Sequence, residues 1–211
     1  LLRANAVVTA LRGDGVATIS GEGAGVLSTV VREHASLTEL CGLPLETLRQ
    51  DGLVELDVAG QGLGAAGASV LAHLLPAART LTSLTLSGNR LGAEGAAFLA
   101  EALRLPTCGL RWLQLNDNDF EATAAGSLGI ALRENRSLAY LGLDGNAIGA
   151  DRSGLLFKGL KANETLTELN LGDNKLRVLG SGLVADLLKA NATITSIDLR
   201  ENGLKSEGAA H

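Results

Sequence analysis

Aliphatic residues recur along this chain in a fixed pattern, L-x-x-L-x-L-x-x-N-x-[LIF], with polar or small residues between them. The first half of each unit alternates apolar and polar positions, which predicts a short β-strand. An earlier unit begins at Leu53 and has Gln61 in place of the asparagine. The clear units are 29, 28, 28 and 28 residues apart and begin at Leu81, Leu110, Leu138, Leu166 and Ile194. This period predicts a solenoid in which each unit packs against its neighbours.

The second half of each unit has small residues, followed by apolar residues ten and fourteen positions after the asparagine. These apolar positions are Leu99, Leu103, Leu128, Leu132, Leu156, Leu160, Val184 and Leu188. Apolar residues four apart predict a helix, and the long period leaves room for one in every unit. We therefore predict an α/β fold: one right-handed solenoid (horseshoe) of about seven units, with a concave parallel sheet and convex helices.

The asparagine of each unit has a predicted structural role at the point where the strand turns away. Its side-chain amide can satisfy backbone groups, and the copies in stacked units then form a ladder. Gln61 suits this role less well because its extra methylene moves the amide. The predicted ladder consists of Asn89, Asn118, Asn146, Asn174 and Asn202.

The first quarter of the chain is less regular than the rest. We divide the chain into degenerate units at 1–52 and regular units at 53–211, which together form one continuous solenoid. Leu37 and Leu40 open a strand, but Leu53 follows too soon for a helix of normal length. Residues 41–52 are therefore predicted to form an irregular loop or hairpin.

Both ends of the sequence lie within a unit. The opening Leu1–Asn5 matches the helix end at 187–191, and 205–211 falls where a further helix would begin. Val8 and Leu11 fit the strand of a first, degenerate unit. We expect the chain to be a segment of a longer protein.

Charge, hydropathy and cysteine content narrow the possible partners. The net charge of −5 and the isoelectric point near 5.2 argue against nucleic-acid binding, which requires a basic surface. No window approaches 18 uninterrupted apolar residues, so no membrane span is predicted. Cys41 and Cys108 lie in different units, too far apart for a disulfide. We expect free thiols and a cytoplasmic location, with attachment to an organelle or the cytoskeleton left open.

The full consensus is N-x-[ST]-L-x-x-L-x-L-x-x-N-x-[LI]-G-x-x-G-A, and its inter-repeat part occurs at 135–138, 163–166 and 191–194. This pattern resembles the ribonuclease-inhibitor-like subfamily of leucine-rich repeats. Residues 40–42 and 60–64 also resemble a header in Ala/Gly-rich repeat proteins of microalgae and other protists. The resemblance implies an intracellular, eukaryotic protein. It leaves function open, because the family includes ribonuclease inhibitor, Ran GTPase-activating protein and the sensor ends of NOD-like receptors.

Several motifs that often mark chemistry have a structural explanation here. The G-x-G-x-x-G at 62–67 is largely repeat consensus, and the acidic residue that would hold a ribose is missing. The Asn-x-Ser/Thr triplets at 135, 163 and 191 recur with the repeat, so they do not indicate glycosylation. The histidines are scattered, and no set of residues has metal-ligand spacing or forms a catalytic triad. We predict no cofactor, no metal and no enzymatic activity.

The one alternative from another class is GTPase regulation, resembling Ran GTPase-activating protein. Arg111 and Arg200 lie on or beside strands from which they could reach a partner's phosphate. Isolated surface arginines are usually solvated, and the predicted concave face is acidic, so we rank this alternative second.

The polar positions between the leucines of each unit face the concave side, and they define the candidate site. Trp112 and Tyr140 occupy the third position of neighbouring units, about 5 Å apart. Exposed aromatics surrounded by carboxylates favour a protein-binding surface that selects basic partners, in a scaffold that forms part of a larger intracellular hetero-complex. The alternatives are that the aromatic pair only stabilises the sheet, or that a partner binds the helices or an end. The predicted contact residues are Glu55, Asp57, Trp112, Gln114, Asn116, Asp117, Tyr140, Asp144, Glu168, Asn170, Asp173, Asp198 and Arg200.

Overall fold

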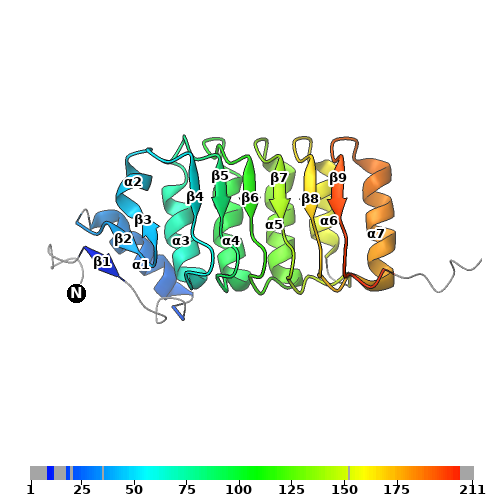
Figure 1. Ribbon diagram of the computed structural model, residues 1–211, viewed down its shortest axis with the longest axis horizontal. Coiled ribbons are helices and arrows are strands. Elements are labelled where there is room, and N and C mark those ends of the chain that lie inside the picture. Colours follow the sequence, from blue (N-terminus) through cyan, green and yellow to red (C-terminus); the bar gives the residue numbers. More distant parts are fainter. Residues whose placement is uncertain (1–8, 12–17, 20, 35, 152, 205–211) are drawn as a thin grey trace, which may run out of the picture.

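The computed structural model describes residues 9–11, 18–19, 21–34, 36–151 and 153–204. Within these residues, six short strands form a parallel sheet in sequence order (Figure 1). The strands are β4 (Glu55–Asp57), β5 (Ser83–Thr85), β6 (Trp112–Gln114), β7 (Tyr140–Gly142), β8 (Glu168–Asn170) and β9 (Ser196–Asp198). Equivalent positions of neighbouring units lie side by side, as in the pairing of Leu56 with Leu84. The predicted α/β solenoid is confirmed.

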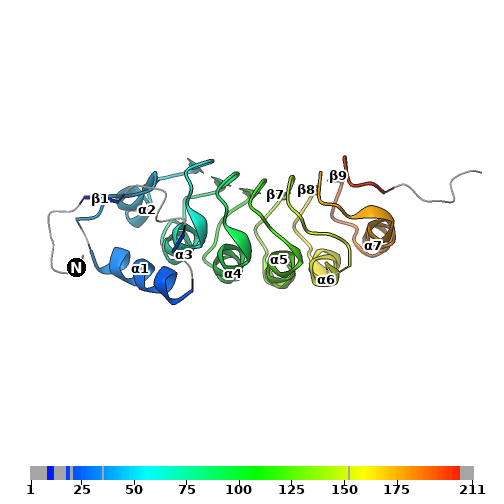
Figure 2. The ribbon, with the colours of Figure 1, turned by 90° about the horizontal axis from the view of Figure 1, so that it is seen from below.

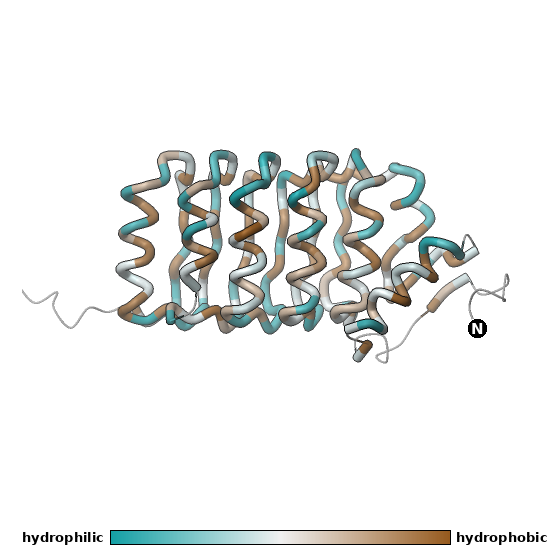
Figure 3. The backbone as a smooth tube through the Cα atoms, turned by 180° about the vertical axis from the view of Figure 1, so that it is seen from behind, coloured by the Kyte–Doolittle hydropathy of each residue, from teal (hydrophilic) through white to brown (hydrophobic). Residues whose placement is uncertain are grey.

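Helices cover one face of this sheet, and the other face is open. Figure 2 shows the two layers from below, and Figure 3 shows the helices from behind. Strands in a sheet lie about 4.8 Å apart, whereas packed helices need about 8–10 Å, so the sheet lies on the inside of the curve. The helices that follow β4 to β8 are α3 (Gly64–Leu74), α4 (Gly92–Leu103), α5 (Ala122–Glu134), α6 (Gly154–Ala162) and α7 (Arg177–Ala190).

The core between the two layers is aliphatic, as the pattern predicts. Leu99, Leu128 and Leu156 are buried on the inner sides of α4, α5 and α6. The prediction was wrong at Leu188, which is 59% exposed on α7. No helix in the described part of the chain packs on the outer side of α7, and the neighbouring Leu187 is the buried residue instead.

A second, smaller sheet precedes the regular units and does not pair with the larger sheet. Strand β1 (Ala10–Leu11) pairs in parallel with β2 (Glu39–Leu40), and β2 pairs in antiparallel orientation with β3 (Leu43–Pro44). Helix α1 (Glu22–Glu33) connects β1 to β2. The strands predicted around Leu11 and Leu40 are therefore present, while Val8 lies outside the described residues.

Residues 41–52 contain the predicted hairpin and also a short helix that was not predicted. This helix is α2 (Leu45–Arg49). Arg49 donates hydrogen bonds to the carbonyl oxygens of Val31 and Leu37 at 2.5 and 2.7 Å, which satisfies backbone acceptors at and after the end of α1. Burial lowers the pKa of the Arg49 guanidinium. A five-residue helix is too short to show a helical period in the sequence.

The predicted asparagine ladder runs along the edge where the strands end, and all five of its members are buried. Oδ1 of Asn118 accepts a hydrogen bond from the backbone N–H of Asn89 at 3.0 Å. Its Nδ2 donates to the carbonyl of Leu86 at 2.9 Å. In the same way, Oδ1 of Asn146 accepts the backbone N–H of Asn118 at 3.0 Å. Gln61 is exposed and its Nε2 donates only weakly, to a carbonyl two residues away, so it does not extend the ladder, as predicted.

The ladder is interrupted at Asn174. Its Oδ1 is buried but accepts no hydrogen bond from any residue that the structure describes. In a regular unit this atom would accept the N–H of the preceding asparagine, here Asn146. The turn after Asn146 differs from the turns after the other ladder asparagines. In this turn the N–H of Ala147 donates to the carbonyl of Phe120 at 2.8 Å. The residues at the position of Ala147 in other units have positive φ: Arg90 (54°), Asp119 (57°) and Lys175 (58°).

A second asparagine ladder, which was not predicted, runs along the opposite edge of the sheet. Nδ2 of Asn163 donates to the carbonyl of Leu132 at 2.7 Å, and its Oδ1 accepts the N–H of Leu166 at 2.7 Å. Asn135 and Asn191 make equivalent bonds. These are the asparagines of the Asn-x-Ser/Thr triplets, so the repeat needs their side-chain nitrogens for its own backbone.

Candidate interaction surface on the concave sheet

The sheet register places the only tryptophan beside the only tyrosine. Trp112 pairs with Tyr140 across β6 and β7, and their rings stack with centroids 3.6 Å apart and planes 5° from parallel. On the other side, Trp112 pairs with Ser83, whose side chain is too small to cover an indole ring. Trp112 is 40% exposed. One face of its ring is therefore covered by Tyr140 and the other is open above β5. The predicted column of two aromatics is confirmed.

Gly142 makes room for this stack. A Cβ at Gly142 would lie 3.1 Å from the hydroxyl oxygen of Tyr140 and 2.8 Å from Oδ1 of Asn116. The ring of Tyr140 thus extends along its own strand over a position that in other units carries a side chain. A side chain at this position would thus meet both the tyrosine hydroxyl and the amide of Asn116.

Tyr140 is half-buried, and this burial is the main reason why its pKa is raised above the ordinary value of 10. The nearby carboxylates of Glu168, Asp144 and Asp198 act in the same direction, because they oppose a second negative charge. A hydrogen bond with Asn170 acts the other way. The tyrosine hydroxyl is therefore neutral at physiological pH and sits in a field of negative charge.

The carboxylates predicted at the site do not form a single cluster. At the edge where the strands end, Asp117, Asp144, Asp173 and Arg200 line a polar cleft of about 230 Å³. This cleft lies in the loops that follow β6 to β9.

The remaining carboxylates of the predicted site lie on the strands themselves. Glu168 is exposed beside Tyr140 on the neighbouring strand. Glu55 and Asp57 are exposed on β4, two strands from Trp112, and are separated from it by Ser83 and its strand. The face therefore carries carboxylates on both sides of the aromatic stack.

Two predicted contact residues mainly support the fold. Oδ1 of Asn116 accepts the N–H of Asp144 at 3.0 Å, and Oδ1 of Asn170 accepts the N–H of Gly172 at 2.9 Å. These two amides fix the loops that carry the carboxylates, so they position the surface more than they form it. Gln114, a third predicted contact residue, is partly buried on β6.

Arg200 is engaged within the fold. Its guanidinium donates to both carboxylate oxygens of Asp198, with the shortest distance 2.6 Å from Nη2 to Oδ2. This hydrogen bonding lowers the pKa of Asp198 and raises that of Arg200. The arginine considered for a role at a partner's phosphate is thus paired with a carboxylate of its own face. Arg111 is exposed.

The other chemical signals have structural explanations. Gly62 and Gly64 have φ of 65° and 56°, and Gly67 packs on Leu63, which accounts for the G-x-G-x-x-G motif by turn geometry and packing. Across the described residues, no group of three or more His, Cys, Asp and Glu side chains is arranged to hold a metal. In the same part of the chain, no helix is long and apolar enough to cross a membrane. Cys41 and Cys108 are buried and are not joined by a disulfide.

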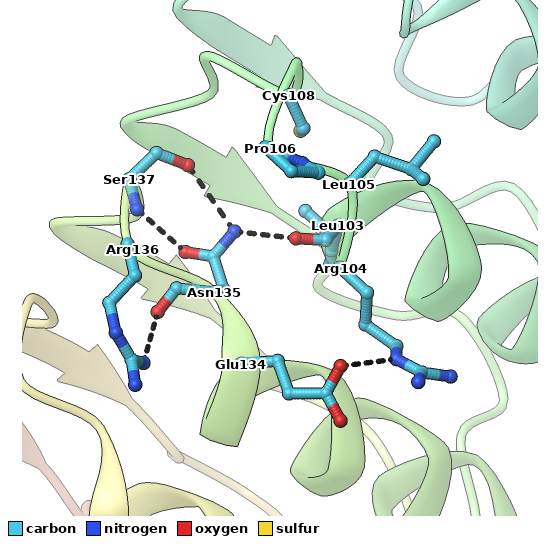
Figure 4. Close-up of a pocket in the computed structure, with 9 residues that line it drawn as sticks. All are labelled: Leu103, Arg104, Leu105, Pro106, Cys108, Glu134, Asn135, Arg136 and Ser137. Carbon is cyan, nitrogen blue, oxygen red and sulfur yellow. Dashed lines mark hydrogen bonds and ion pairs between the residues drawn. The ribbon is translucent and has the colours of Figure 1, made fainter.

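A small pocket of about 280 Å³ lies beside α4 and α5, where the second asparagine ladder ends (Figure 4). The unit there is one residue longer than the others and has Thr107 where later units have asparagine. Asn135 bonds across the gap to the carbonyl of Leu103 at 2.8 Å. Burial raises the pKa of the Cys108 thiol, and Arg104 is paired with Glu134 at 2.8 Å. The pocket therefore results from the irregular unit, and Arg136, which also lines it, donates to the backbone carbonyls of Arg133 and Asn135.

One surface feature was missed at the sequence level. A cleft of about 490 Å³ separates the loop at 147–151 from the start of α7 at 175–179. The first residue of α6 is eight positions after Asn146, against three or four positions after the ladder asparagine in the other regular units. The repeat spacing gives no signal of this late start, because the step from Leu138 to Leu166 is the usual 28 residues.

Comparisons with known proteins agree with this fold. A family model described as "Leucine Rich repeat" matches residues 77–100, 162–180 and 190–210. Among solved structures, "Leiomodin-1 Actin-Binding Site 2 (ABS2)" is similar with a TM-score of 0.50 and 21% sequence identity over 74% of this chain and 76% of that chain. No protein with curated function matches the chain in sequence. The chain thus carries leucine-rich repeats and has the solenoid fold that such repeats form.

Proposed function

We propose that this leucine-rich-repeat protein is a non-catalytic binding module whose concave sheet holds a basic segment of a protein partner, with Trp112 as the main contact. The observation that carries the proposal is the Trp112–Tyr140 stack, in which one indole face is left open at the centre of the sheet. An exposed, rigid aromatic residue is a frequent energetic centre of protein interfaces. Stacking on Tyr140 fixes the side-chain conformation of Trp112, so little conformational entropy is lost when a partner binds.

The surrounding charges favour a basic segment. Glu168 and Asp144 lie on one side of the stack, and Glu55 and Asp57 lie beyond the open face of Trp112. A guanidinium or ammonium group above Ser83 would stack on the indole and approach these carboxylates. The one cation among the proposed contact residues, Arg200, is neutralised by Asp198.

The repeat subgroup, the cellular setting and the assembly of the protein are also part of this proposal. Membership of the ribonuclease-inhibitor-like subgroup, an intracellular eukaryotic setting and a place in a larger assembly rest on the repeat consensus described above. Leiomodin is named for an actin-binding site, but 21% identity supports a shared fold alone. GTPase regulation stays the second candidate: Arg200 is paired with Asp198, which leaves the exposed Arg111 as its arginine.

Because Trp112 is the only tryptophan, its fluorescence reports on this face alone. We expect an oligo-arginine peptide to quench or shift that fluorescence in a saturable and salt-sensitive manner, whereas an oligo-glutamate peptide has no effect. With a labelled oligo-arginine peptide, the double variant Trp112→Ser, Tyr140→Ser should lose at least about 2 kcal/mol of binding free energy. Glu168→Gln should weaken binding, while the control Glu164→Gln, which lies in a loop off the sheet, should not.

Two results would contradict this proposal. One is parental affinity in the double variant, which would leave the aromatic pair with only a structural role. The other is equal binding of oligo-glutamate. Thermal unfolding of each variant provides the control for an intact fold.

A further inference from the structure

The cleft beside α7 originates in a missing helical turn. Helix α6 starts at Gly154, whereas in neighbouring units the helix starts three or four residues after the ladder asparagine. Residues 147–151 and Ser153 are not helical. This is also where the ladder is interrupted at Asn174. Both features result from the altered turn at Ala147, whose N–H is bonded to Phe120.

Where the first turn of α6 is missing, the loop at 147–151 faces the start of α7 across the cleft. Figure 2 shows α7 out of the row formed by α4, α5 and α6, closer to the sheet. Val178 and Leu179, in the first turn of α7, are 51% and 65% exposed. The equivalent positions of α4 and α5 carry small or polar residues, Ala93 and Glu94 in the first and Ala122 and Thr123 in the second. Two large aliphatic side chains are thus presented to solvent at the mouth of a cleft of about 490 Å³.

Charge at the cleft is predominantly positive. Lys175 and Arg177 line it and are exposed, and Asp151 is the one carboxylate among its described lining residues. The first turn of α7 adds the positive end of the helix dipole, although the N–H of Arg177 already donates to the carbonyl of Asn202 at 2.7 Å. A purely apolar ligand would make no ion pair with Lys175 or Arg177, and a basic ligand would be repelled by them.

We propose that this cleft is a second binding site, distinct from the concave sheet, for a partner segment in which aliphatic residues are followed by carboxylates. The aliphatic side chains fill the space left by the missing turn and cover Val178 and Leu179. The carboxylates meet Lys175, Arg177 and the N-terminus of α7. The two surfaces differ in charge preference, since the sheet selects basic segments and the cleft selects acidic ones.

The test uses fluorescence anisotropy of three labelled peptides with the 211-residue chain. One peptide has two leucines followed by two glutamates, the second replaces the glutamates by lysines, and the third replaces the leucines by serines. We expect saturable binding of the first peptide, with a dissociation constant below about 1 mM. Binding of the lysine peptide belongs to the concave sheet, so Leu179→Ser leaves it unchanged. No saturable binding of the first peptide, equal binding of the serine peptide, or loss of lysine-peptide binding in Leu179→Ser would overturn the proposal.

Two matched variants locate the binding. Leu179→Ser removes an exposed side chain of the cleft, and Leu188→Ser removes an equally exposed leucine of the same helix outside it. We expect Leu179→Ser to weaken the first peptide about tenfold or more and Leu188→Ser to leave it unchanged. The pair Lys175→Glu, Arg177→Glu should shift preference to the lysine peptide. Equal losses in the two leucine variants, or an unchanged charge preference, would place binding elsewhere. An unaltered Trp112 emission spectrum confirms the fold of each variant.

Discussion

The sheet and the helix layer respond differently to the same irregular unit. Across β7 and β8 the strand register continues without change, with Tyr140 opposite Glu168 and Leu141 opposite Leu169. Behind these strands, α6 loses its first turn and α7 leaves the row of helices (Figure 2). Strand pairing depends on backbone N–H and C=O groups, which are present along the whole strand. The turn after each ladder asparagine depends on the φ angle of the residue that directly follows the asparagine. Local turn geometry can thus open a site on the helix side while the concave surface stays continuous.

The largest expected effect tests how tightly the regular helices are packed. At Gly159 in α6, a Cβ would overlap the carbonyl oxygen of Gly129 in α5, so Gly159→Ala must push two backbones apart. We expect a loss of about 3 kcal/mol in unfolding free energy. At Gly182 in α7 a Cβ meets nothing within 4 Å, and Gly182→Ala should stabilise the protein by about 0.5 kcal/mol. Urea denaturation of both variants measures this contrast. Similar effects at the two sites would show that α7 is packed like α6.

An intermediate effect compares two ladder asparagines that are both fully buried. Asn118 bonds through both Oδ1 and Nδ2, whereas Asn174 bonds through Nδ2 alone. Asn118→Ala leaves donors and acceptors unpaired and should cost about 2–3 kcal/mol, while Asn174→Ala should cost about 1 kcal/mol. Denaturation midpoints of the two variants decide the matter, and an equal or larger loss at Asn174 would contradict the interruption of the ladder.

Contacts between equivalent positions of neighbouring units could be predicted from the sequence repeat. Trp112 and Tyr140 share the third position of neighbouring units, so their contact followed from the repeat alone. The orientation of Tyr140 over Gly142 did not follow, because it depends on side-chain conformation. Helix α2 was missed because five residues show no period, and the second asparagine ladder was seen only as a consensus motif. The cleft beside α7 depends on the φ of one alanine, Ala147, which composition and spacing do not determine.

The smallest expected effect concerns the continuity of the sheet face across β7 and β8. Burial first, and then Glu168 and other carboxylates, raise the pKa of Tyr140, the only tyrosine. Because the pKa is higher in the folded state, the associated stability is present below the ordinary tyrosine pKa, about 10, and is lost as pH rises through the folded value. Absorbance at 295 nm should therefore show Tyr140 ionising above the pH of a model tyrosine. Glu168→Gln should lower this pKa without restoring the ordinary value, because burial persists. An unchanged pKa in that variant would mean that Glu168 does not face the ring, and the acidic field proposed around Trp112 would lose its nearest member.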